Sequence, residues 1–340
     1  MKKLIDDLLS GSPVDIEGLE EALHRVMSGE AEDIQIAGLL VALRSRPVEG
    51  RVLAAMARAM RQHRVSVTCQ VRPLIDTCGT GGDGSGTFNI STAAAFVVAG
   101  AGGAVAKHGN RGVSSRTGSA DVLEALGVQL DVPADAAAKM IDAAGFSFLF
   151  APRYHPAMKH VMPVRNALGV RTHFNLLGPL SNPALAEYQV LGVYAPELTL
   201  PMAEALCELG TRAAMVVHCD GVDEICLHAP TKGHLVKEGE IEEIMIDPLD
   251  FGVARAAVSD LAGGEAEENA AILKSVLAGE SGPRSDVVAL NAGAACWMGG
   301  LAGTLAEGLE VAREVLRDGR ATKVLDRAVA SSARLGVNSE

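Results

Sequence analysis

The stretch that decides the fold is residues 73–107, PLIDTCGTGGDGSGTFNISTAAAFVVAGAGGAVAK. It contains a short apolar strand, a glycine-rich loop, an apolar helix from Ala93 to Gly100 and a second short strand from Gly103 to Ala106. Two strands joined by a helix are typical of the parallel β-α-β unit. The stretch therefore predicts an α/β fold with a mostly parallel central sheet covered by helices.

The same alternation continues towards the C-terminus. Further apolar runs of strand length alternate with Ala-rich helical stretches, and they are Phe146–Phe150, Gln189–Tyr194 and Ala214–Cys219. The charge-interrupted segment Leu235–Ile246 predicts an antiparallel hairpin at the edge of the sheet. Glu265–Leu277 and the tail after Leu290 return to helical periodicity.

Upstream of this region, the first 68 residues contain no strand pattern. Apolar residues recur there at helical spacing in Ile16–Met27, Ile34–Leu43 and Val52–Met60, with Pro13 and Pro47 interrupting the pattern. The N-terminal segment thus predicts a small all-helical domain in front of the larger α/β domain. A chain of 340 residues is long enough for two such domains.

The charge balance excludes some classes of function. The chain has 30 Lys and Arg residues against 42 Asp and Glu residues, a net charge of −12. A general nucleic-acid-binding protein needs a basic surface, so we expect no nucleic-acid partner. A small anionic ligand remains compatible with this charge, because backbone dipoles and one or two basic side chains can hold a phosphate.

The sequence also predicts a soluble, cytoplasmic protein. Its six cysteines are scattered without a CxxC pair, which is typical of reduced thiols in a core. The N-terminus has acidic residues where a signal peptide would be apolar. The longest uncharged apolar run, Ala93–Ala106, has 14 residues and is too short to span a bilayer, so we expect no membrane partner.

The loop after the first strand is rich in glycine. Five of the eight residues from Gly79 to Gly86 are glycine, which lets the backbone approach a ligand closely. Consecutive amides in such a loop can form an anion-binding nest. Asn89, Ser91 and Thr92 then provide cap-type side chains at the start of a helix, where free amides and the helix dipole favour phosphate. The loop therefore predicts a phosphate site.

Two alternatives compete with this interpretation. Gly79, Gly81 and Gly84 also match the dinucleotide pattern GxGxxG. A dinucleotide fold would place an acidic residue ~20 positions further on, at the end of the second strand, to hold a ribose. Here that strand ends in Lys107, and a cation favours phosphate over ribose hydroxyls. The other alternative is a tight turn without a ligand, but turns rarely need so many glycines.

A second unusual loop, KHGNRGVSSRTGSAD, covers residues 107–121. It combines three basic residues, four small hydroxyl side chains and three glycines, and it leads directly into a helix. The alternative, a solvated basic loop, would require neither the glycines nor the hydroxyls. Two such loops at neighbouring strand ends predict a ligand with more than one phosphate.

Adjacent carboxylates follow the strand that ends at Cys219, in the motif DGVDE at residues 220–224. Mg²⁺ typically binds through one or two carboxylates together with substrate phosphates. Acidic turns are common, so the motif alone is moderate evidence. Beside two phosphate loops it predicts a magnesium site, because a pyrophosphate leaving group needs its charge neutralised.

Residues 154–172 form a further mixture of basic and apolar residues, followed by NLLGPLSNP at residues 175–183. An arginine in this region, such as Arg165, can form a bidentate contact with a substrate carboxylate. An ordinary surface arginine is the alternative. Five histidines show no metal-ligand spacing and are expected to be structural or exposed; they are His63, His173, His218, His228 and His234.

Together these motifs resemble the anthranilate phosphoribosyltransferase family of the nucleoside phosphorylase-like class. The resemblance covers nearly the whole chain, to about Leu335. Four segments carry it: DTCGTGGDGSGTFNIST (76–92), KHGNRGVSSRTGSADVLEALG (107–127), HPAMKHVMPVRNALGVRTHFNLLGPLSNP (155–183) and DGVDE (220–224). It implies transfer of the phosphoribosyl group of phosphoribosyl pyrophosphate to the amine of anthranilate, a step of tryptophan biosynthesis, with Mg²⁺ as cofactor.

The resemblance also implies an organisation into domains. A helical domain would comprise residues 1–68 plus about 163–187, and an α/β domain residues 69–162 plus 188–340. A homodimer would form through the helical domain.

Roles for individual residues follow from the same resemblance. Phosphoribosyl pyrophosphate would be held by Gly79, Gly82, Asp83, Thr87, Asn89, Ile90, Ser91, Thr92, Lys107, Ser115 and Ser119. Anthranilate would be contacted by Gly79, His108, Asn110, His155 and Arg165, and Mg²⁺ by Ser91, Asp223 and Glu224. No acid or base is expected, because the aniline amine of anthranilate is neutral at pH 7. Lys107 would act electrostatically on the departing pyrophosphate.

Two rival classes remain to be tested. A pyrimidine nucleoside phosphorylase shares the architecture, but it uses inorganic phosphate, needs no metal and has no use for Asp223 and Glu224. A non-catalytic nucleic-acid-binding relative should have a basic face and a degraded carboxylate pair. The net charge of −12 and the intact motif at residues 220–224 argue against it.

Overall fold

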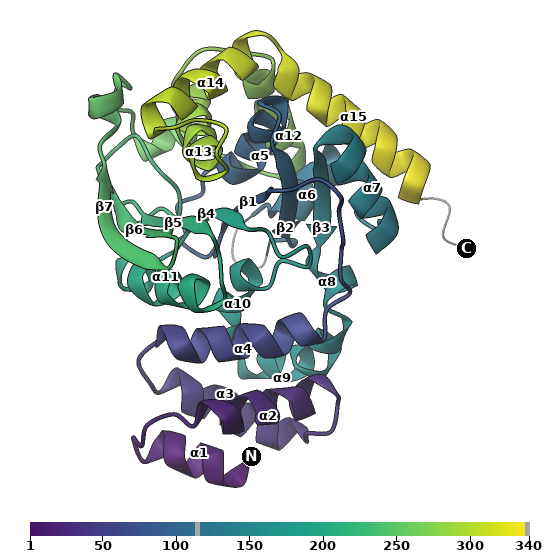
Figure 1. Cartoon of the computed structure of the whole chain (residues 1–340), viewed down its shortest axis with the longest axis vertical. Coiled ribbons are helices and arrows are strands. Elements are labelled where there is room, and N and C mark those ends of the chain that lie inside the picture. The colour runs from purple at the N-terminus through teal and green to yellow at the C-terminus, as the bar shows by residue number, and fades with distance from the viewer. Residues whose placement is uncertain (113–115, 337–340) are drawn as a thin grey trace.

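The computed structural model describes residues 1–112 and 116–336 of the chain (Figure 1). A seven-stranded sheet lies at its centre, in the order β3-β2-β1-β4-β5-β6-β7. The strands are β1 Leu74–Gly79, β2 Ala104–Gly109, β3 Phe146–Phe150, β4 Tyr188–Gly192, β5 Ala213–His218, β6 Thr231–Lys237 and β7 Glu240–Ile246. The first five are parallel to one another, and β6 and β7 are antiparallel.

The predicted α/β class is therefore confirmed, and the predicted hairpin forms the β6–β7 edge of the sheet. Two strands are longer than the sequence predicts, because β6 begins at Thr231 rather than Leu235 and β2 continues beyond Ala106. Lys107 and His108 lie inside β2, where they pair with Phe148 and Leu149 of β3, so the basic loop begins only after Gly109. The predicted end of β2 was too early, because the polar side chains of Lys107 and His108 interrupt the apolar run.

Helices cover both faces of the sheet. Successive side chains of β5 point to opposite faces, so alternate residues belong to different apolar clusters. Met215 and Val217 pack with α5 (Ile90–Gly100) and α13 (Pro283–Met298). Ala214 and Val216 belong to the opposite cluster, with α11 (Thr199–Glu208). The remaining helices of the α/β layers are α6 Ser119–Ala125, α7 Ala134–Ala144, α12 Ala266–Leu277, α14 Leu305–Arg317 and α15 Arg320–Gly336.

A helical layer lies beyond α11, at the bottom of Figure 1. Its N-terminal members are α1 Lys2–Leu9, α2 Ile16–Met27, α3 Asp33–Arg44 and α4 Gly50–Gln62, so the three helices predicted there are confirmed. Asp15 begins α2 by accepting a hydrogen bond from the Gly18 amide at 3.1 Å. The layer also receives α9 (Met162–Leu168) and α10 (Phe174–Leu180), which follow the short helix α8 (Ala151–Tyr154).

One apolar cluster joins the helical layer to the sheet. Leu53 of α4 and Phe174 of α10 belong to the same cluster as Leu191 of β4 and Val216 of β5. A domain boundary at residue 68 or at residue 163 therefore stays a prediction, because burial is continuous across it. Among the described residues, no helix is both long and apolar enough to span a membrane.

Candidate active site

The site lies where the chain order of the sheet reverses. The strands β1, β2 and β3 follow one another in one direction from β1, whereas β4 and β5 lie on its other side. Open α/β sheets bind ligands at the carboxyl ends of the strands at such a switch point. Gly79 ends β1 and pairs with Gly192, which ends β4. The glycine-rich loop starts at this point.

Both of these glycines are required by the close approach of Asp223. A Cβ atom on Gly79 would lie 2.4 Å from an Asp223 carboxylate oxygen, and one on Gly192 would lie 1.5 Å from the Asp223 carbonyl oxygen. The Gly81 amide donates a hydrogen bond of 2.8 Å to the same carboxylate. The structure thus brings the predicted glycine loop and the predicted DGVDE motif together.

Three carboxylates gather at this point. Asp83 accepts a hydrogen bond from the Asp223 amide at 3.3 Å, and Glu224 accepts one from the Ser91 amide at 3.0 Å. Burial, together with the charges of Asp83 and Glu224, raises the pKa of Asp223 well above its usual value. Burial raises the pKa of Glu224 to about 7, an effect that Lys107 opposes. Buried carboxylates with raised pKa values lack a cation that would compensate their charge.

Lys107 lies beneath the loop and is almost completely buried. Its ammonium donates to the Thr77 carbonyl oxygen and, at 3.3 Å, to the Ser91 hydroxyl. Burial lowers the pKa of Lys107, and the charge of Asp76 opposes this shift. Asp76, also fully buried, accepts a 2.8 Å hydrogen bond from Asn182. Asp76 and Asn182 were not predicted to belong to the site, although a carboxylate in the middle of an apolar strand is a usable signal.

At the start of α5, the side chain of Asn89 is not available as a cap, although the sequence predicts it. Asn89 occupies the N-cap position but makes no side-chain cap. Its amide group donates to the Thr117 carbonyl at 3.2 Å and accepts from Asn269 at 3.0 Å, so it connects three segments. Ile90 is buried in the core, and its amide donates to the Phe88 carbonyl oxygen. The bonds of Asn89 to Thr117 and Asn269 compete with capping of the helix by its side chain.

Other residues predicted to bind phosphoribosyl pyrophosphate lie around the glycine-rich loop. Gly82, at the loop tip, accepts a 2.6 Å hydrogen bond from Arg171, which also stacks 4.7 Å from the Tyr194 ring centroid. Arg171 was not among the predicted site residues. The Thr87 hydroxyl lies 3.3 Å from the Ser85 hydroxyl, and the Thr92 hydroxyl is buried with no hydrogen-bond partner.

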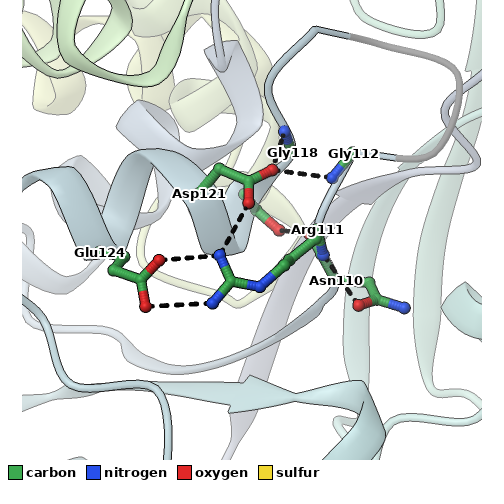
Figure 2. Close-up of polar contacts among 7 residues, drawn as sticks. Asn110, Arg111, Gly112, Gly118, Asp121 and Glu124 are labelled. Atoms are coloured by element: carbon green, nitrogen blue, oxygen red, sulfur yellow. Dashed lines mark hydrogen bonds and ion pairs between the residues drawn. The ribbon is translucent and has the colours of Figure 1, made fainter.

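The basic loop is fastened at both ends by one carboxylate (Figure 2). An Asp121 oxygen accepts hydrogen bonds from the Gly112 amide at 2.8 Å and the Gly118 amide at 2.9 Å. The Arg111 guanidinium bridges Asp121 at 3.0 Å and Glu124, which it contacts through two nitrogens. Ser119 begins α6 next to this network. Ser115, which was predicted to bind phosphoribosyl pyrophosphate, lies outside the described residues.

Two neutral histidines are among the residues predicted to contact anthranilate. The rings of His108 and His155 lie 5.1 Å apart, and the His108 Nδ1 is 3.0 Å from the Gly178 carbonyl oxygen. The Nε2 atoms of both rings are buried without a hydrogen-bond partner. Burial lowers the pKa of His108 to about 3 and that of His155 to about 4. Both rings are therefore uncharged at neutral pH.

Arg165 lies on α9, 5.9 Å from the Phe174 ring centroid, and its polar contact is a 3.6 Å approach to the Met162 sulfur. The described residues provide no carboxylate within ion-pair distance of it. Burial lowers the pKa of Arg165, which leaves a partly desolvated cation that can receive a carboxylate. Asn110 is exposed, and its side-chain oxygen accepts a 2.8 Å hydrogen bond from the Arg111 amide.

The fold and the site together define a class. A helical bundle, an α/β domain and a phosphate-type loop facing carboxylates are the features of an enzyme that handles a phosphorylated sugar. Two family models match the chain: "Glycosyl transferase family, helical bundle domain" over residues 2–64 and "Glycosyl transferase family, a/b domain" over residues 71–322. The chain is thus a glycosyl transferase of this two-part type.

Individual relatives narrow this class. An anthranilate phosphoribosyltransferase from Symbiobacterium thermophilum is 49% identical, with 100% of both chains covered. The structure of one from Thermus thermophilus is 48% identical, with a TM-score of 0.92, 97% of this chain and 99% of that chain covered. One from Saccharomyces cerevisiae, in complex with PRPP and Mg, is 28% identical, with a TM-score of 0.89 and 98% of both chains covered. The chain belongs to the anthranilate phosphoribosyltransferase family.

This membership favours the transferase over both rival classes. Neither the nucleoside phosphorylase interpretation nor the nucleic-acid-binding interpretation is supported by these relatives, which are named as anthranilate phosphoribosyltransferases.

Proposed function

We propose that this chain transfers the phosphoribosyl group of phosphoribosyl pyrophosphate to the amine of anthranilate, releasing pyrophosphate. The observation that carries the proposal is the convergence of the glycine loop and the Asp223–Glu224 pair at the switch point of the sheet. A polyphosphate donor needs both backbone donors and a means of charge neutralisation, and this point of the fold provides the two together.

The donor would lie across the glycine loop and the start of α5, with Gly79, Asp83, Ser91 and Ser119 near its phosphates and ribose. Lys107 would assist departure of the pyrophosphate. Its ammonium donates hydrogen bonds to the Thr77 carbonyl oxygen and the Ser91 hydroxyl, and the charges of Asp76 and Glu224 favour its protonated form. Held in a buried position, it requires little reorganisation as negative charge develops.

The residues present fit Mg²⁺. Asp223 and Glu224 are hard oxygen donors, and each carboxylate is fixed by a backbone amide while its pKa indicates uncompensated charge. Asp83 joins them through the Asp223 amide, and the Ser91 hydroxyl lies next to Lys107. When bound, Mg²⁺ would neutralise charge on the pyrophosphate. The relative from Saccharomyces cerevisiae binds PRPP and Mg, which agrees with this assignment.

Anthranilate would enter between Asn110, His108, His155 and Arg165. Arg165 would hold its carboxylate, and the two neutral imidazoles would contact the ring without removing protons at neutral pH. The attacking amine is uncharged, so holding it in line with the anomeric carbon is the main requirement.

We also propose a homodimer that forms through the helical layer. Ile34 and Val41 occupy one side of α3, seven residues apart, and their side chains are 77% and 48% exposed. Leu9 of the adjacent α1 is exposed as well. Apolar side chains gathered on one surface are typical of a protein interface. The free thiols of the described chain fit the reducing cytoplasm as its location, and the net charge of −12 fits the absence of a nucleic-acid partner.

The decisive experiment follows anthranilate fluorescence after the protein and phosphoribosyl pyrophosphate are added, first with Mg²⁺ and then with excess EDTA. We expect loss of fluorescence only with Mg²⁺. Folded protein that causes no loss in either condition would overturn the acceptor assignment, and loss that persists in EDTA would overturn the metal assignment.

A further inference from the structure

Two cysteines and a histidine that the proposed reaction does not use lie together at the base of the DGVDE motif. Cys219 directly precedes the motif, and Cys226 and His228 follow it. One potential ligand atom from each of the three side chains lies within 4.8 Å of the other two, and no other such group of three occurs among residues 1–112 and 116–336. Both cysteines are fully buried and free.

The histidine is oriented as a metal ligand would be. The His228 Nε2 lies 3.4 Å from the Asp220 carbonyl oxygen, and the Nδ1 is buried with no hydrogen-bond partner among the residues that the structure describes. Metal-binding histidines commonly donate one ring N–H to a backbone carbonyl, which leaves the lone pair of the other nitrogen for the metal. A buried polar atom without a partner requires an explanation, and a metal ion supplies one.

The backbone holds the two cysteines at a fixed separation. Cys219 and Val222 exchange two backbone hydrogen bonds of 2.9 Å, which form a closed turn through Asp220 and Gly221. The Cys226 amide donates to the Thr231 hydroxyl at 3.2 Å, at the beginning of β6. The Cys219 thiol itself donates to the Ala229 carbonyl oxygen at 3.4 Å. The three side chains are therefore positioned by a short segment that is tied at both ends.

We propose that Cys219, Cys226 and His228 bind a borderline-soft divalent cation, Zn²⁺ above all, at a site separate from the Asp223–Glu224 pair. Two sulfurs and one imidazole nitrogen are three of the four ligands of a tetrahedral zinc site, and solvent supplies the fourth from the half-buried side of His228. On coordination each thiol gives up its proton to solvent. This proposal does not depend on the proposed transferase reaction.

The donor types keep the two cation sites distinct. Thiolates and imidazole select zinc, whereas Asp223 and Glu224 offer only oxygen atoms, which suit Mg²⁺. A zinc ion at Cys219 and Cys226 would join the residues on either side of the DGVDE motif. It would thereby stiffen the turn that presents Asp223 to the glycine loop.

The test is a titration of the metal-free, reduced protein with Co²⁺ in the presence of excess Mg²⁺, which occupies the oxygen ligands. We expect one Co²⁺ per chain, thiolate-to-cobalt charge-transfer absorption in the near ultraviolet, and loss of that absorption when Zn²⁺ is added. Cys226→Ser and His228→Ala should each weaken binding by at least about tenfold. Cys207→Ser, which changes a half-buried thiol outside the cluster, should leave the titration unchanged.

Several outcomes would overturn the site. Cobalt that binds without charge-transfer absorption would place the ion on carboxylates. Absorption that develops at the same Co²⁺ concentration in His228→Ala as in the unsubstituted chain would exclude the histidine. If Cys226→Ser does not fold, His228→Ala decides the matter, because its ring lies at the surface side of the cluster. As a second measurement, Zn²⁺ should raise the Tm of the unsubstituted chain more than that of His228→Ala at the same concentration.

Discussion

At the level of single residues, the environment of Arg165 differs from that of the arginines that pair with carboxylates. Arg58, Arg72, Arg111 and Arg153 all form ion pairs with carboxylates. Arg165 instead contacts a sulfur atom and an aromatic ring, and burial lowers its pKa. A cation that is partly desolvated and has no protein counter-ion is suited to binding an anion from outside.

We expect Arg165→Ala to raise the KM for anthranilate by about tenfold or more, because hydrogen bonds to charged groups contribute roughly 1.5–3 kcal/mol. The kcat should change little, since the contact would form equally in the ground state and the transition state. Steady-state kinetics with varied anthranilate measure both constants. Lys159→Ala, which removes an exposed cation from a neighbouring helix, is the control. An unchanged KM would remove Arg165 from the acceptor site.

Glu224 permits a prediction about pH. Its pKa rises from 4.5 to about 7 on folding, so between these values the folded chain binds more protons than the unfolded chain. Without metal, its contribution to stability is fully present below pH 4.5 and is lost as the pH rises through about 7. Glu224→Gln removes this dependence while it keeps the shape of the side chain.

Denaturant unfolding in EDTA from about pH 5 to 8 measures the effect. Glu224→Gln should match the unsubstituted protein near the acidic end of this range and exceed its free energy of unfolding above about pH 7. Saturating Mg²⁺ should reduce the difference, because the cation compensates the carboxylate charge. Parallel pH profiles for the two proteins would show that Glu224 is already ionised in the folded, metal-free state at the acidic end.

At the level of elements, Asp121, at the start of α6, connects the two described ends of the basic loop. Asp121 accepts from two amides six residues apart and also pairs with Arg111 (Figure 2). Glu124 contacts the same guanidinium but is exposed and touches no loop amide. The two carboxylates thus have the same charge and the same partner, but only one of them fixes the loop.

Asp121→Asn should lower the free energy of unfolding by about 1–3 kcal/mol, because a charge-assisted acceptor of two amides is weakened. It should also raise the KM for phosphoribosyl pyrophosphate several-fold, since Asn110 and Ser119 flank the loop. Glu124→Gln should change the free energy of unfolding by less than about 1 kcal/mol, as expected for an exposed pair. Thermal unfolding and kinetics test both variants, and equal effects of the two would contradict a special role for Asp121.

At the scale of the whole molecule, the helical layer combines a buried side with an exposed apolar side. Its buried side chains share one cluster with the sheet, so the layer is not an independent core. Its outer side presents Ile34 and Val41. Together with Leu9 of α1, this pair gives the layer apolar surface that packing within the described chain leaves exposed.

Ile34→Glu should shift the chain from dimer to monomer, because a buried unpaired charge at an interface costs several kcal/mol. Light scattering after size-exclusion chromatography measures the mass over a range of concentrations. Met245→Glu, at the far edge of the sheet where the side chain is 67% exposed, should leave the mass unchanged. A dimer that is equally stable in Ile34→Glu would place the interface elsewhere.

Local patterns in the sequence were sufficient to predict the kinds of element and the chemistry of the loops. Alternation of apolar runs defined the strands and helices, because burial of one face imposes a period of about two or 3.6. Glycine density and adjacent carboxylates indicated phosphate and magnesium, because those properties are local to the chain. The predicted boundaries differ mainly where polar side chains such as Lys107 are buried in a strand.

Which of these segments meet could not be predicted, because it depends on how the chain packs in three dimensions. Gly81 and Asp223 are 142 positions apart, and Gly82 and Arg171 are 89 positions apart, yet each pair forms a hydrogen bond. Asn89 is directed to Thr117 and Asn269 rather than to the helix that it begins, and His228 joins Cys219 and Cys226 without a recognisable ligand spacing. These contacts depend on strand order and loop packing, which bring distant residues together and leave no periodic signal in the sequence.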